Sequence, residues 1–136
     1  MIRAKPMLIV ADVPDASRWF QDVLGVRSGH GGDDYEMLLD GDDVVLQLHR
    51  WDVREHPHQG DPRDPSRGNG VLLWFSCTDL DAVLARVAAG RARILEGPTR
   101  NPAAGHWELW LQGPEGHRVV VAGPRRGLEP SDAAGA

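Results

Sequence analysis

The histidines are the side chains of this sequence best suited to acid–base chemistry or metal binding. The chain has six; His56 and His58 lie in a polar stretch, and His49 ends an apolar run. No two of them form an H-x-x-x-H pair or an H-E-x-x-H motif, which would place two imidazoles on one helical face. The spacing therefore gives no support for a histidine-based metal site, and surface or hydrogen-bonded histidines are the simpler interpretation.

A second feature is the segment HWELW at 106–110, in which polar and indole side chains share a predicted strand. A carboxyl group in an apolar pocket has a raised pKa and can act as a base, so Glu108 with His106 or His49 is a candidate acid–base set. The chain also has five Trp but only two Phe and one Tyr. Indole suits either a core or stacking on a flat ligand.

The composition excludes several classes of function. A net charge of −5 gives no electrostatic reason to bind nucleic acid or an anionic membrane. No apolar run approaches the roughly 18 residues of a membrane helix, and the N-terminus does not have the pattern of a signal peptide. The single cysteine, Cys77, cannot form an internal disulfide, so we expect a cytoplasmic protein.

The elements that must position these residues form two similar modules. In the first, an apolar run at 6–11 predicts a strand, Asp12 to Gly25 bounds a helix, and three short strands follow. The helix carries an apolar stripe of Ala16, Trp19, Phe20, Val23 and Leu24. The second module repeats the order, with its helix starting near Asp79 and ending at Gly90. An internal repeat of this kind requires each half to bury one sheet face against one helix.

These patterns predict one domain over residues 1–122. Module one covers 4–49 and module two covers 70–122, with a polar linker loop at 50–69. A loop of that length is unusual unless it is a linker or a functional lid. We expect residues 123–136 to form a flexible C-terminal tail.

The two modules and the segment GHWELWLQGPEGH at 105–117 resemble the vicinal oxygen chelate superfamily. This superfamily contains glyoxalases, extradiol dioxygenases, fosfomycin-resistance enzymes and bleomycin-resistance proteins. The segment is similar to the family pattern W-G-x-R-E-x-x-x-x-D-P-D-G-N and departs from it at Trp107, Gly113 and His117. The resemblance implies an α+β fold of two tandem β-α-β-β-β modules. Their curved mixed sheets would enclose a cavity, which a second chain usually completes.

The resemblance also implies where a divalent metal would be held. Mapping the family's four ligand positions onto this chain gives Lys5, Gln47, Leu72 and Val120. A protonated lysine cannot ligate, and leucine and valine have no donor atoms. We therefore expect no metal and no cofactor, which places the chain with the metal-free, bleomycin-resistance-like branch.

Strand alternation predicts which side chains face the cavity. We expect a ligand-binding set and no catalytic residue, and the first hypothesis is a homodimer that sequesters an antibiotic or another flat aromatic natural product. One alternative is a metal-free isomerase, cyclase or lyase that uses Glu108 and a histidine. Others are a metal-dependent glyoxalase- or dioxygenase-like enzyme and a regulatory domain without catalytic activity. The predicted ligand-binding residues are Gln47, His49, Trp51, Leu72, Trp74, His106, Glu108, Trp110 and Val120.

Overall fold

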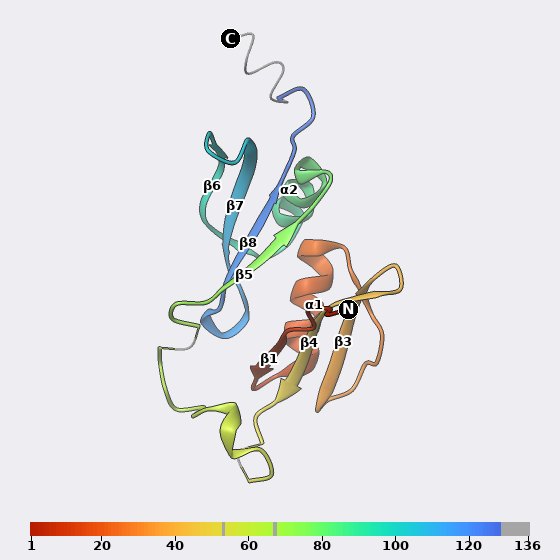
Figure 1. The fold of residues 1–136 in the computed structure, drawn as a ribbon, viewed down its shortest axis with the longest axis vertical. Coiled ribbons are helices and arrows are strands. Elements are labelled where there is room, and N and C mark those ends of the chain that lie inside the picture. Colours follow the sequence, from red (N-terminus) through yellow and green to blue (C-terminus); the bar gives the residue numbers. More distant parts are fainter. Residues whose placement is uncertain (53, 67, 129–136) are drawn as a thin grey trace. The chain divides into compact units, whose positions relative to one another are not determined.

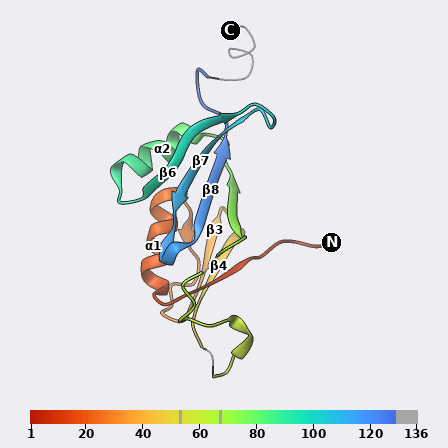
Figure 2. The same ribbon diagram turned by 90° about the vertical axis from the view of Figure 1, so that its left-hand side faces the viewer.

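A computed structural model describes residues 1–52, 54–66 and 68–128 (Figure 1). The chain divides into two compact units, Met1–Arg67 and Gly68–Ala136. In each unit one helix covers one face of a four-stranded sheet (Figure 1; Figure 2). This confirms the predicted α+β class with two β-α-β-β-β modules. Among these described residues, no helix has the length and apolar composition that a membrane-spanning helix would need.

Unit one contains β1 (Met7–Val10), α1 (Val13–Leu24), β2 (Arg27–Ser28), β3 (Tyr35–Asp40) and β4 (Asp43–Arg50). Its sheet has the order β1-β4-β3-β2, with β1 and β4 parallel and the other pairs antiparallel. A short 3-10 helix, η1 (Pro57–Gln59), lies in the polar loop that follows.

Unit two repeats this arrangement with β5 (Leu72–Ser76), α2 (Leu80–Ala89), β6 (Arg93–Asn101), β7 (His106–Gln112) and β8 (Arg118–Gly123). A 3-10 turn, η2 (Pro114–Gly116), joins the last two strands. The sheet order is β5-β8-β7-β6, and β5 and β8 are its parallel pair. The strand order of this sheet matches that of unit one, so each strand of one module has an equivalent strand in the other.

Helix α1 begins and ends where the sequence predicts. The Asp12 carboxylate caps it by accepting from the Asp15 amide at 2.9 Å, and Gly25 ends it with a φ of 71°. Its buried face differs from the predicted stripe, because Ser17 is buried whereas Trp19 is half-buried. The other buried residues of the helix are Val13, Ala16, Phe20 and Val23.

Ser17 is buried because it binds a buried carboxylate on the sheet. Glu36 is 3% exposed and accepts hydrogen bonds from the hydroxyls of Ser17 at 2.9 Å and Ser28 at 2.7 Å. It also accepts from the backbone amides of His30 and Gly31, at 3.0 and 2.8 Å. Burial alone would raise the pKa of Glu36, but these hydrogen bonds together lower it. One ionised side chain thus ties the helix to the β2–β3 connection.

One group of buried apolar residues of unit two lies between α2 and its sheet. Leu80, Val83 and Val87 are buried on the helix. Leu109 and Leu111 of β7 are fully buried and pair with Val121 and Val119 of β8, so they share one face. The other face of β7 and β8 is therefore turned away from α2. The predicted strand alternation is confirmed on β7.

The first residues of the expected tail contact the second module. Arg125 donates to Asp81 at 3.1 Å, and its guanidinium lies 5.2 Å from the centre of the Trp107 ring. Arg126 donates to Asp79 at 2.7 Å, and the Leu128 carbonyl accepts from the Trp107 indole N–H at 3.2 Å. Residues 129–136, the rest of that expected tail, lie outside the described residues.

We expect Glu36→Gln to lower the free energy of unfolding at pH 7 by about 1–3 kcal/mol, because charge-assisted hydrogen bonds are replaced by neutral ones. The folded pKa lies below the unfolded one, so this stabilisation is complete above the unfolded pKa. It is lost as the pH falls through the folded pKa, so the variant and wild type should converge in acid. Urea unfolding at several pH values measures this, with the exposed Glu55→Gln as control. Equal stability of Glu36→Gln and wild type at pH 7 would contradict the assignment.

Candidate functional site

Two indoles stand side by side on the sheet face of unit two that is turned away from α2. The register pairs Val120 of β8 with Trp74 of β5 on one side and with Trp110 of β7 on the other. Val120 is fully buried between them, while Trp74 is 43% exposed. The centres of the two indole rings lie 6.5 Å apart and their planes meet at 86°. These residues form an aromatic surface, which we call the indole face (Trp74, Trp110 and Val120).

A nearly buried carboxylate borders the indole face. Glu108 is 9% exposed and accepts three hydrogen bonds from side chains. Its Oε2 accepts from the Asn101 amide at 2.7 Å and lies 2.9 Å from His106 Nε2, and its Oε1 accepts from the Trp110 indole N–H at 3.1 Å. The carboxylate thereby fixes one indole, one imidazole and the last residue of β6.

The expected raised pKa of Glu108 is wrong. The hydrogen bond from Asn101 is the largest cause of a lowered pKa, and those from His106 and Trp110 add to it. Burial by itself would raise the pKa of Glu108, but the hydrogen bonds outweigh it. Glu108 is therefore ionised at neutral pH and is a poor general base.

His106 lies between the carboxylate and the exposed indole. Its ring centre is 6.0 Å from that of Trp74, and its Nε2 faces Glu108. Because an ionised carboxylate accepts but cannot donate, Nε2 must carry a proton. The neutral imidazole then has its lone pair on Nδ1, which has no hydrogen-bond partner within the described part of the chain.

A pocket of about 300 Å³ opens beside the indole face, between β6 and β7. Two irregularities in register, between Ile94 and Glu96 and between Glu96 and Thr99, bend β6 at this place. Gly97 allows the bend, since its φ is 96° and a Cβ there would lie 2.5 Å from the Glu108 carbonyl oxygen. The pocket is lined by Glu96, Thr99, Arg100, Asn101, Pro102, Glu108 and Trp110.

The predicted residues of unit one lie on β4 and directly after it. Gln47 accepts from the Tyr35 hydroxyl at 2.6 Å and donates to the Lys5 carbonyl at 3.0 Å. His49 Nδ1 lies 2.6 Å from the carbonyl of Arg50. The indole of Trp51 lies beside Gly60 in the loop.

The loop after β4 folds back over its own sheet, which the sequence did not predict. Gln59 accepts from the Asp52 amide at 2.8 Å and lies 3.3 Å from the His49 imidazole. The ring of His56 meets that of His49 edge-on at 5.7 Å. A pocket of about 470 Å³ results, lined by Met7, Ile9, His49, His56, Pro57, His58 and Gln59.

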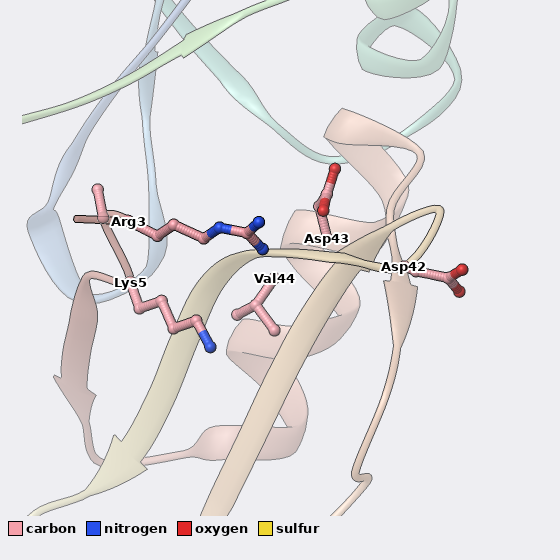
Figure 3. Close-up of a pocket in the computed structure, with 6 residues that line it drawn as sticks. Arg3, Lys5, Asp42, Asp43 and Val44 are labelled. Carbon is pink, nitrogen blue, oxygen red and sulfur yellow. The ribbon is translucent and has the colours of Figure 1, made fainter. Parts of the chain in front are cut away.

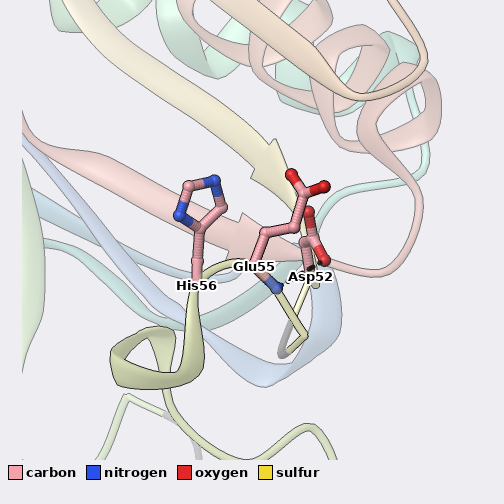
Figure 4. A group of neighbouring side chains, drawn as sticks. All are labelled: Asp52, Glu55 and His56. Atoms are coloured by element: carbon pink, nitrogen blue, oxygen red, sulfur yellow. Dashed lines mark hydrogen bonds between the residues drawn. The ribbon is translucent and has the colours of Figure 1, made fainter.

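Two further groups of charged residues lie in unit one. Asp52, Glu55 and His56 each place one ligand atom within 4.8 Å of the others, but Glu55 and His56 are exposed (Figure 4). A second pocket, of about 460 Å³, lies between the N-terminal segment and the β3–β4 turn (Figure 3). The formal charges of its four charged residues sum to zero, so the pocket favours neither a cationic nor an anionic ligand. These residues are Arg3, Lys5, Asp42 and Asp43.

The four positions of the family metal site do not fit a divalent ion. Leu72 and Val120 provide no donor atom, and both ends of the Gln47 amide are already hydrogen-bonded. The fourth position, Lys5, carries an ammonium group, which is a donor and not a ligand. These four positions therefore supply too few ligands to hold a divalent ion.

The structure brings together six of the nine predicted ligand-binding residues within unit two and places the other three in unit one. Sequence reasoning missed Asn101 and Glu96. The turn sequence NPAAG at 101–105 is a signal for Asn101, since a hairpin there pairs Asn101 with His106. The six residues in unit two are Leu72, Trp74, His106, Glu108, Trp110 and Val120.

Residues 4–121 match the family profile of the Glyoxalase/Bleomycin resistance protein/Dioxygenase superfamily. The chain belongs to this superfamily. No curated protein matches the sequence.

Solved structures of several bacterial proteins share the fold. A protein of unknown function from Agrobacterium tumefaciens aligns with a TM-score of 0.71 at 20% identity, over 90% of this chain and 94% of its own. A glyoxalase/bleomycin resistance protein/dioxygenase from Nocardioides has a TM-score of 0.68 at 15% identity, over 96% and 89%. A virulence protein from Salmonella typhimurium has a TM-score of 0.64 at 22% identity, over 91% and 99%. At these identities the likeness concerns the fold alone.

Proposed function

We propose that this chain is a metal-independent binding protein that sequesters a flat aromatic molecule, such as an antibiotic or another natural product, on the indole face. The observation that carries the proposal is the exposure of Trp74, which is 43% although it lies in mid-strand beside a second indole. Large aromatic side chains are costly to leave in water and are suited to stacking on flat ligands. Three of the four family metal positions, Lys5, Leu72 and Val120, cannot ligate a metal, which supports the metal-independent branch.

The proposal predicts that Trp110→Ala weakens binding at least about tenfold. Stacking contributes roughly 0.5–1.5 kcal/mol beyond area burial, and about 1.4 kcal/mol corresponds to a tenfold change. The probe is the tightest binder from a panel of flat natural-product antibiotics, measured by calorimetry and tryptophan fluorescence. Trp19→Phe, which alters a half-buried indole on α1, is the matched control and should keep wild-type affinity. Wild-type affinity in Trp110→Ala would refute the placement of the site.

We also infer a homodimer. Met7, Leu72 and Trp74 are large apolar residues that each expose more than two-fifths of their surface, on the sheet faces turned away from the helices. Exposed apolar surface of this kind is typical of an interface. Light scattering at micromolar concentration should give about twice the 14.9 kDa of one chain. A monomeric mass would contradict the inference.

The second candidate function is metal-free proton transfer, and the His106–Glu108 pair is the observation that favours it. With Nε2 held by the ionised Glu108, the free Nδ1 is the atom able to accept a proton from a bound molecule. Glu108 would then position the base and would not itself act as one. In this respect the arrangement resembles a carboxylate–histidine pair of a hydrolase, without a nucleophile.

Mass spectrometry of the antibiotic after incubation separates the two candidates. A binding protein returns the molecule unchanged, with no deuterium at its carbon-bound positions when the incubation is in D2O and labile N–D and O–D groups are exchanged back in H2O. Proton transfer predicts conversion or exchange that His106→Gln abolishes, while Glu108→Gln shifts its pH profile. Exchange that persists in His106→Gln would exclude His106 as the base.

A further inference from the structure

The pocket between β6 and β7 places two carboxylates next to the indole face. The register sets Glu96 directly opposite Trp110 and Thr99 directly opposite Glu108, so all four side chains share one face of the sheet. Glu96 and Glu108 both line the pocket, whose volume is about 300 Å³. A ligand lying on Trp110 therefore has an acidic hollow at its edge.

The charges in this pocket are not balanced. The lowered pKa of Glu108 keeps it ionised, and the Asn101 and Trp110 groups that bind it are neutral donors. His106, its third partner, balances this charge only in its protonated form. Glu96 is exposed and has no ion-pair partner among residues 1–52, 54–66 and 68–128. Arg100 is the one cation among the described residues that line the pocket, so two carboxylates and one guanidinium leave a formal charge of −1.

Charge also varies along the indole face. Glu108 precedes Trp110 by two positions on β7, and Gln112 follows it by two, so they lie on opposite sides of the indole. The Gln112 row contains Arg118 of β8 and Arg93 of β6, both exposed. One end of the indole face is therefore acidic and the other basic.

We propose that the ligand of the indole face is an aromatic cation, with its ring on Trp74 and Trp110 and its positive group directed toward Glu96 and Glu108. This inference rests on the proposed function and adds to it the charge and orientation of the ligand. Indole faces attract cations through their quadrupole, and a desolvated carboxylate strengthens that preference. Arg118 and Arg93 disfavour the reversed orientation by like-charge repulsion.

Two probes of the same shape test the charge preference. At pH 8 acridine is neutral, whereas N-methylacridinium carries a permanent positive charge on the same three-ring frame. Fluorescence titration of the full chain should show N-methylacridinium binding about tenfold more tightly. Raising the ionic strength should reduce the ratio of the two affinities, because salt screens the attraction between the cation and partly exposed carboxylates.

Two variants, one that removes a negative charge and one that removes a positive charge, test whether the preference for a cationic ligand comes from the pocket. Glu96→Gln should weaken N-methylacridinium about fivefold and leave acridine unchanged, while Arg100→Gln should strengthen N-methylacridinium by a similar factor. Glu55→Gln removes the same charge in unit one and should have no effect on either probe. If Glu96 and Arg100 had only a structural role, their substitutions would change the affinities for both probes alike. They would not change the affinity for N-methylacridinium in opposite directions while leaving that for acridine unchanged.

The outcomes separate this inference from the proposed function. Equal binding of the two probes, or equal effects of Glu96→Gln and Glu55→Gln, would overturn the charge preference and leave the indole face as an aromatic site. If neither probe binds at millimolar concentration, both the inference and the proposed function fail.

Discussion

The ionised carboxylate of Glu108 is the constraint on which the candidate site depends. It is nearly buried beside the indole face, and three side-chain donors satisfy its lone pairs. Each of those bonds fixes a part of the site. The bond from Trp110 orients one indole, the contact with His106 sets the imidazole tautomer, and the bond from Asn101 fixes the end of β6 beside the hairpin turn.

The two modules share a topology but use a buried carboxylate on opposite faces. Glu36 in unit one faces α1, where Ser17 and two backbone amides hold it, so it stabilises the contact between helix and sheet. Glu108 in unit two faces away from α2. Both carboxylates have lowered pKa values because their hydrogen-bond donors outweigh burial. The same chemistry thus supports the core in one module and a candidate ligand site in the other.

The two-module fold and the residues of the indole face could be predicted from the sequence, because both follow from periodic patterns. Strand alternation is strictly periodic, so it put Trp74 and Trp110 on one face and Leu109 and Leu111 on the other. It could not give the pKa of Glu108, because that depends on Asn101 from a neighbouring strand. The pocket between β6 and β7 depends on irregularities in register that periodicity does not reveal. The fold-back of the loop onto His49 depends on one glutamine, Gln59, which has no sequence signature.

The titration of Glu108 tests the account most directly. Its side-chain carboxyl carbon can be followed by NMR from pH 2 to pH 8 in the wild type and in Asn101→Ala. The account predicts that Glu108 titrates below the usual range of glutamate and that Asn101→Ala raises its pKa, since the Asn101 amide is the main cause of the depression. A pKa of Glu108 within or above the usual range of glutamate in the wild type would contradict the three-donor arrangement and the site built on it.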